Sequence, residues 1–62
     1  MNTHEIFEML NDAGFSVTVS ADHETVFASL NRSIRLMEVE IALGFQVDRS
    51  RMYRTSNAIA IS

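Results

Sequence analysis

Hydrophobic and polar residues in the first part of the chain recur with the period of an α-helix. Asn2 is a favourable N-cap residue, and Glu5 three positions later completes a capping box. A glycine in the left-handed conformation commonly follows a helix, and Gly14 stands where the pattern stops. The pattern predicts a helix that begins at Thr3 and ends at Gly14. Its apolar face consists of Ile6, Met9, Leu10 and Ala13, flanked by Phe7.

After Gly14 the period changes to two, which is typical of a half-buried strand. From Phe15 onward, apolar residues alternate with Ser and Thr as far as Ser20. A polar turn at residues 21–24 follows, and the run Thr25–Leu30 alternates again. These two runs predict a β-hairpin whose short loop lacks the Asn-Gly signature of the tightest turns.

The same sequence pattern returns about thirty positions later. Aligned without gaps, residues 35–47 repeat residues 5–17, with Glu8, Gly14, Phe15 and Val17 falling on identical residues at 38, 44, 45 and 47. Self-similarity of this kind indicates a repeated structural unit. We interpret the chain as an internal duplication, residues 5–31 and 35–61. Each unit consists of a helix followed by two extended runs.

Residues 33–43 fit two patterns. Apolar residues alternate from Met37 to Val47 as in a strand, but Ser33 is also a suitable cap for a helix that Gly44 would end. The internal repeat favours the helix. A helix places Glu40 on the apolar face, where an unpaired carboxylate is costly. Glu40 therefore pairs with an arginine of the segment 49–54, lies at an interface, or shows that the helix assignment is wrong.

The end of the chain completes the predicted fold. Residues 48–54 fit either a turn and a strand or a short helical turn capped by Asp48, and the pattern does not choose between them. Ala58–Ile61 is apolar throughout, which indicates a strand inside a sheet. We predict a single α+β domain, residues 1–62, in the order α-β-β-α-β-β, with a four-stranded antiparallel sheet and two helices on one face.

Length and composition bear on stability and location. A chain of 62 residues buries a modest share of its surface, and without cysteine it has neither disulfides nor thiolate zinc sites. Self-association is the remaining supplement, and the second helix carries a second apolar stripe. No apolar run is long enough to cross a membrane, and no signal-peptide pattern is present. We expect a cytoplasmic homodimer whose interface contains Ile34, Met37 and Ile41.

Charge is divided unequally along the chain. Residues 1–31 contain five acidic residues and no Lys or Arg, whereas residues 32–62 contain five arginines and three acidic residues. Such asymmetry favours oriented association with a partner of complementary charge. We predict an acidic face that binds a protein partner, composed of Glu5, Glu8, Asp12, Asp22 and Glu24.

Residues that would support catalysis or metal binding are not arranged in a recognised pattern. The chain has two histidines and scattered serines, without a nucleophile-base arrangement or a glycine-rich phosphate loop. His4, Glu8 and Asp12 have the spacing of a metal stripe on a helix, but a solvated helix face has the same spacing. We predict no catalytic residues, no metal and no cofactor.

The arginines suggest an alternative function. Guanidinium groups beside an aromatic ring hold phosphates and stack on bases, so Arg49, Arg51, Tyr53 and Arg54 are candidate nucleic-acid contacts. The segment EVEIALGFQVDRSRMYR also resembles a helix-turn-helix, although that family places a small residue where this chain has Glu40.

The acidic pI of about 5.1 disfavours nonspecific DNA binding. We therefore expect a small non-catalytic protein that regulates or inhibits a macromolecular partner. Small phage or mobile-element inhibitors of bacterial defence systems have this size and composition. The alternative is a nucleic-acid-binding transcriptional regulator.

Overall fold

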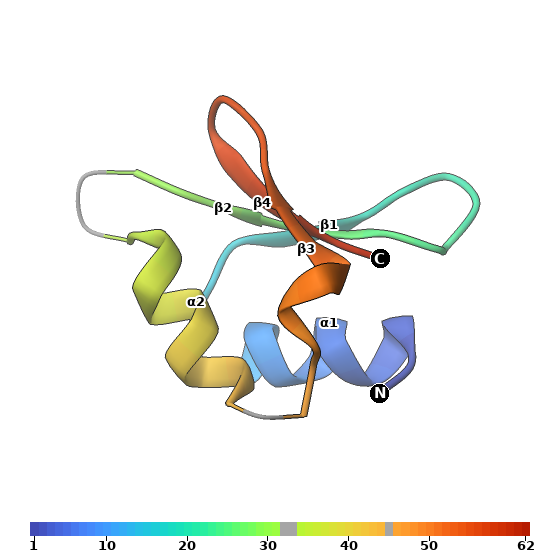
Figure 1. Cartoon of the computed structure of the whole chain (residues 1–62). Helices are drawn as coiled ribbons and strands as arrows, with labels where there is room; N and C mark the ends of the chain where they lie inside the picture. The colour runs from blue at the N-terminus through green and yellow to red at the C-terminus, as the bar shows by residue number, and fades with distance from the viewer. Residues whose placement is uncertain (32–33, 45) are drawn as a thin grey trace.

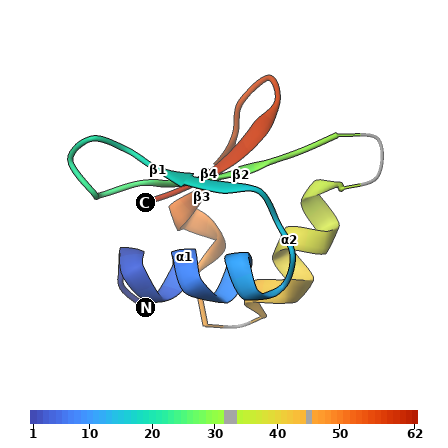
Figure 2. The same ribbon diagram turned by 180° about the vertical axis from the view of Figure 1, so that it is seen from behind.

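The computed structural model describes residues 1–31, 34–44 and 46–62. The elements are α1 (Thr3–Asp12), β1 (Val17–Val19), β2 (Val26–Ser29), α2 (Leu36–Leu43), the 3-10 helix η1 (Arg49–Arg51), β3 (Met52–Arg54) and β4 (Ala58–Ile61). α1 and α2 lie on one face of the sheet, and no described element covers the opposite face (Figures 1 and 2). The predicted α+β class and element order are confirmed.

The first helix begins and ends as its sequence predicts. The Asn2 side chain accepts from the Glu5 N–H at 2.9 Å, and the Glu5 carboxylate accepts from the Asn2 N–H at 3.1 Å. At the other end the Gly14 N–H bonds Asn11 and the Phe15 N–H bonds Leu10, which is a Schellman motif with Gly14 at φ 95°. Phe15 is thereby held in the helix end, so β1 begins only at residue 17.

The strand order is β1-β2-β4-β3, and every neighbouring pair is antiparallel. The sheet consists of the predicted hairpin β1–β2 and the hairpin β3–β4, and the two join through the pairing of β2 with β4. β4 is therefore central, which explains its four apolar residues. Ile59 and Ile61 face the helices, whereas Ala60 faces the open side. Ala60 is nevertheless fully buried because its register neighbours, Phe27 and Tyr53, cover it.

The core lies between the sheet and the two helices. Its side chains come from α1, α2, β2 and β4, and it includes one residue of the connection after α2. The buried apolar residues of this cluster are Ile6, Leu10, Val26, Ala28, Val39, Leu43, Val47, Ile59 and Ile61. The helix interpretation of residues 36–43 is thus confirmed, because Val39 and Leu43 are buried on one side of α2.

The predicted start of the second helix was wrong, since α2 begins at Leu36 with Arg35 at its N-cap. The Asn31 side chain accepts from the Ile34 N–H at 2.9 Å, and the Asn31 N–H bonds the Ile34 carbonyl, so Asn31 and Ile34 bond each other before α2 begins. The proposed cap, Ser33, lies outside the described residues. Gly44 ends α2 with φ 60°, as predicted.

Both interpretations of residues 48–54 are realised in succession. The Asp48 side chain accepts from the Ser50 N–H at 2.8 Å and caps η1, after which β3 begins at Met52. At this point the two aligned segments of the sequence differ in structure. Val17 lies in β1, whereas its counterpart Val47 lies in a bend before η1. Another aligned position, Phe45, lies outside the described residues. The internal duplication stays a prediction.

Candidate functional site

A groove runs along α1 beneath the outer edge of β1, and we call it the edge groove. Its lining comes from one side of α1 and from the β1–β2 hairpin: Thr3, His4, Phe7, Glu8, Asn11, Asp12, Val19 and His23. The side chains of Phe7 and Val19 are half-buried, and they supply the apolar part of the lining. The exposed carboxylates of Glu8 and Asp12 supply negative charge. The groove is therefore apolar and acidic together.

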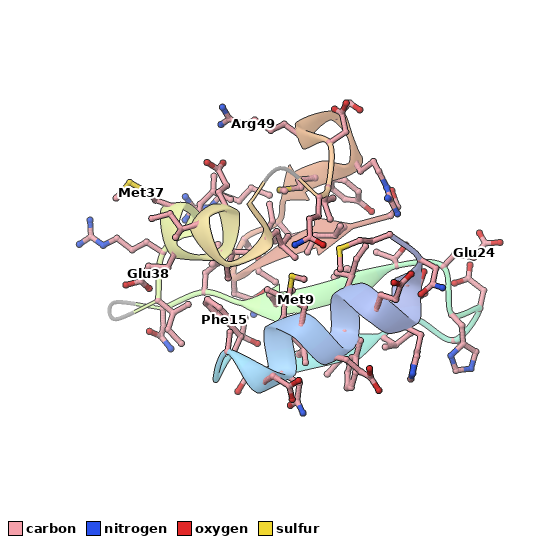
Figure 3. All side chains as sticks on the ribbon, turned by 90° about the horizontal axis from the view of Figure 1, so that it is seen from below. Met9, Phe15, Glu24, Met37, Glu38 and Arg49 are labelled. Carbon is pink, nitrogen blue, oxygen red and sulfur yellow. The ribbon has the colours of Figure 1, made fainter. Side chains whose placement is uncertain are left out.

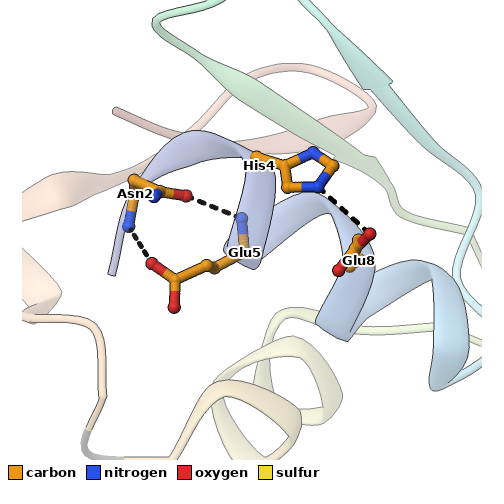
Figure 4. A network of polar contacts seen from close by, with 4 residues as sticks. All are labelled: Asn2, His4, Glu5 and Glu8. Atoms are coloured by element: carbon orange, nitrogen blue, oxygen red, sulfur yellow. Dashed lines mark hydrogen bonds and ion pairs between the residues drawn. The ribbon is translucent and has the colours of Figure 1, made fainter.

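The two acidic residues of the groove receive little internal compensation. Glu8 lies 3.1 Å from the His4 imidazole, an exposed contact that is an ion pair only when the histidine is protonated (Figure 4). Asp12 is the last residue of α1, and no basic residue lies in that turn. A carboxylate at a helix C-terminus opposes the helix dipole, and Glu8 four residues earlier adds like-charge repulsion. Asp12 is thus placed where its charge lowers helix stability.

The hairpin loop contributes a second set of acidic residues. The Asp22 carboxylate accepts from the Ser20 hydroxyl and, at 3.0 Å, from the Glu24 N–H. These bonds hold the pKa of Asp22 below its usual value, with the Ser20 hydroxyl as the main cause. His23, at the loop's turn, has φ 59°, the only positive φ of a non-glycine residue in the described chain. The sequence did not indicate this conformation, because the loop has no Asn-Gly signature.

The structure brings most of the predicted acidic face together. Glu8 and Asp12 line the edge groove, and Asp22 and Glu24 flank His23, which also lines it. Figure 3 shows Glu24 projecting from the hairpin end of the molecule. Glu5 is the exception, because its carboxylate is bound in the capping box on another side of α1 (Figure 4).

A second hollow lies between α2 and η1, and together with the exposed side chains on α2 we call it the α2 surface. Met37 and Ile41 are 66% and 72% exposed, and Met37 projects from the molecule on the same side as Arg49 (Figure 3). The hollow beside them is lined by Met37, Glu40, Ile41, Gly44, Val47, Asp48, Arg49 and Met52. The predicted interface residue Ile34 lies outside α2 and is half-buried, so the predicted stripe is divided.

Glu40 pairs with an arginine of the segment 49–54, which was the first of the three predicted alternatives. Its carboxylate accepts from the Arg49 guanidinium at 3.1 Å. The Glu40 side chain is 29% exposed and that of Arg49 is 81% exposed, so water screens much of the attraction. The pair closes α2 onto η1 without burying a charge.

The arginine cluster is dispersed by the fold. Arg49 is engaged with Glu40, and the Arg51 guanidinium donates to the Ser62 carbonyl and, at 2.9 Å, to the Met1 carbonyl. Arg54 instead lines a third hollow with Arg35 near the start of α2. Tyr53 is 54% exposed on the open face of the sheet. An upstream arginine noted in the sequence, Arg32, lies outside the described residues.

The described residues contain neither a metal-binding cluster nor a helix that could span a membrane. Residues 1–31, 34–44 and 46–62 contain no group of three or more His, Asp or Glu side chains arranged to hold a metal ion. Within the same ranges, neither helix has the length and apolar character that crossing a bilayer requires. Comparison of the chain with protein-family models, with curated proteins and with solved structures finds no match.

Proposed function

We propose that this chain is a small non-catalytic interaction protein that binds a macromolecular partner in the cytoplasm through the edge groove and thereby regulates or inhibits it. The partner is a protein whose contacting segment is basic and partly apolar. The half-buried Phe7 and Val19 suit apolar parts of such a segment, and Glu8 and Asp12 suit its cationic groups.

The observation that carries this proposal is the position of Asp12. A carboxylate at the end of α1, four residues after Glu8 and without a basic neighbour in its turn, costs stability in a small domain. Binding sites are where proteins commonly accept such a cost. A basic partner would relieve the repulsion between these carboxylates, and this relief would contribute to the free energy of binding.

The arginine contacts bear on the rival function. Nucleic-acid binding needs guanidinium groups gathered on one accessible face. Here Arg49 pairs with Glu40, Arg51 ties the two chain ends, and Arg54 lies elsewhere. These contacts favour structural roles for the first two arginines, and they support the acidic groove over a nucleic-acid interface.

The test is a comparison of charge variants in quantitative capture from a cell lysate. The variant Glu8→Gln with Asp12→Asn neutralises the groove, and Glu38→Gln is a control, because Glu38 is an exposed acid of α2 outside the groove. We expect the groove variant to lose specific partners by about tenfold or more, which is the usual effect of removing charges at an interface centre. The control should retain them.

Two results would contradict the proposal. Equal capture by the groove variant and the wild type would show that the acidic groove binds nothing. Capture that disappears on nuclease treatment, or on Arg54→Glu alone, would support the nucleic-acid alternative, in which binding falls steeply with added salt.

We further infer that the α2 surface joins two copies of this chain. A two-fold interface places a surface against a copy of itself, so like charges meet unless both signs are present. The α2 surface contains both signs, Glu40 and Asp48 with Arg49, around the exposed Met37 and Ile41. The edge groove is acidic and would repel its own copy, which leaves it free for the partner.

Sedimentation velocity across a dilution series tests the dimer. The substitution Ile41→Asp should shift the chain to monomer, because it places a charge at the centre of the apolar contact. Tyr53→Thr alters an exposed large hydrophobic residue outside the α2 surface, on the open face of the sheet, and should leave the sedimenting mass unchanged. A wild-type chain that sediments as a monomer at every concentration would exclude this interface.

A further inference from the structure

The outer edge of β1 borders the edge groove, and no described element pairs with it. In the strand order β1 is at the end of the sheet, paired only with β2 among the described elements. The hydrogen bonds between β1 and β2 show which groups face outward. The Ser29 N–H bonds the Ser16 carbonyl and the Ser20 N–H bonds the Thr25 carbonyl, both at 2.9 Å.

The bonded positions of an antiparallel ladder are every second residue, so the residues that alternate with them point their backbone groups the other way. With the register Val17↔Ala28 and Val19↔Val26, the N–H and C=O groups of Val17 and Val19 face away from β2. These are the groups that an additional strand would bond. β1 contains neither proline nor a charged residue, the usual devices that block such pairing.

The side chains of Val17 and Val19 point toward the helices, where both pack against the core margin or the groove. A strand added beside β1 would continue the same pleat, with alternate side chains directed over the α1 side of the groove. There they would meet Glu8, Asp12 and Asn11. The edge supplies backbone bonds, and α1 selects the side chains.

We propose that the partner binds by β-strand addition to β1, as an extended protein segment with Arg or Lys at alternate positions. This inference rests on the proposed function and specifies its binding mode. Charge complementarity chooses the occupant, because the groove and the adjoining hairpin contain Glu8, Asp12, Asp22 and Glu24. A second copy adding through its own β1 would instead bring two acidic grooves together.

The experiment uses the full chain and the probe peptide acetyl-Thr-Arg-Thr-Arg-Thr-Arg-Thr-amide. Two versions of the peptide carry one N-methyl group on the backbone, at the central Arg or at a neighbouring Thr. N-methylation removes a hydrogen-bond donor and leaves the charge unchanged. In strand addition only one of the two alternating positions faces β1.

We expect binding of the parent peptide to shift the amide signals of Val17 and Val19 in NMR spectra and to slow their hydrogen exchange. Methylation at the position facing β1 should weaken binding by about tenfold or more, since it removes a bond and adds a steric block. The other position should change it by less than about threefold. Sensitivity at Arg indicates an antiparallel added strand, and sensitivity at Thr a parallel one.

The outcomes separate this inference from the proposed function. Equal effects of the two methylations, with binding still lost in Glu8→Gln/Asp12→Asn, would overturn strand addition and leave the acidic groove intact. Peptide binding unaffected by those substitutions would count against the groove itself. No binding at millimolar peptide, with a folded chain, would overturn strand addition, and so would Val17 and Val19 amides already protected by self-association.

Discussion

His23 lies in the left-handed region, which disfavours a side chain with a β-carbon. Its φ of 59° occurs at the turn of the β1–β2 hairpin, beside the edge groove. Backbone strain of this kind is often retained where a site needs a side chain. The imidazole therefore occupies a position that glycine would fill more comfortably, and this is consistent with a role for His23 at the groove.

We expect His23→Gly to raise the free energy of unfolding by about 0.5 kcal/mol or more, because glycine adopts a positive φ at little cost. Glu24→Gly is the control, since residue 24 lacks a positive φ and glycine there only adds unfolded-state entropy. Urea denaturation of both variants gives the comparison. Destabilisation by both would show that His23 is not strained.

Asp12 allows a paired test at the two ends of α1. Asp12→Asn should stabilise the chain by about 0.3–0.5 kcal/mol, because it removes a negative charge from the helix C-terminus. Glu5→Gln should have the opposite sign, because it removes a negative charge from the first turn, where the helix dipole favours one. Thermal and urea unfolding measure both. A destabilised Asp12→Asn would remove the stability argument for the acidic groove.

At the scale of elements, one side chain adds to the contacts that hold η1 and β3 to the rest of the molecule. The Arg51 guanidinium contacts the carbonyls of Met1 and Ser62, and so joins the start of the chain to its end. The Ser62 N–H also bonds the Arg51 carbonyl at 2.9 Å. This arginine therefore adds to the pairing with β4 that places β3 in the sheet.

We expect Arg51→Ala to cost about 1–2 kcal/mol of unfolding free energy, as for the loss of partly buried charged hydrogen bonds. It should also speed amide exchange in β3. Arg54→Ala should change stability by less than about 0.5 kcal/mol, the usual range for an exposed position. Equal effects of the two substitutions would show that the contacts to the chain ends contribute little.

For the molecule as a whole, acid stability depends on carboxylates that cap turns. The pKa of Asp22 is lowered mainly by the hydrogen bond from the Ser20 hydroxyl. The pKa of Asp48 is lowered mainly by the hydrogen bond from the Ser50 N–H. A carboxyl group with a lowered pKa binds fewer protons in the folded state than in the unfolded state. Its stabilisation is complete above the ordinary value of 3.8 and is lost as pH falls through the folded pKa.

We therefore expect unfolding free energy to decrease with acidification below about pH 4, the range in which unfolded carboxyl groups titrate. The double variant Asp22→Asn with Asp48→Asn should show a shallower decrease. Urea titrations at a series of pH values between neutral and acidic measure the slope. Identical slopes for the variant and the wild type would assign acid lability to other groups.

What the sequence determined by itself was local. Four features could be predicted from nearby residues, and each was confirmed: the capping box at Asn2, the glycine ends of both helices, the alternation of β2 and the wholly apolar run of β4. The predicted start of α2 was wrong because Ile34 bonds Asn31 and Arg35 takes the N-cap position, and sequence propensity does not rank such alternatives. The order of elements followed from these local patterns.

Only the tertiary structure decided which distant residues meet. Pairing of β2 with β4 leaves β1 at an edge of the sheet that no other described element pairs with. This edge, the apolar side chains of Phe7 and Val19 and the carboxylates of Glu8 and Asp12 thereby lie at one groove. The same topology sends Arg49, Arg51 and Arg54 to separate places, although they are neighbours in sequence. Strand order and helix placement are set by burying one shared core, and this depends on long-range packing that no local pattern contains.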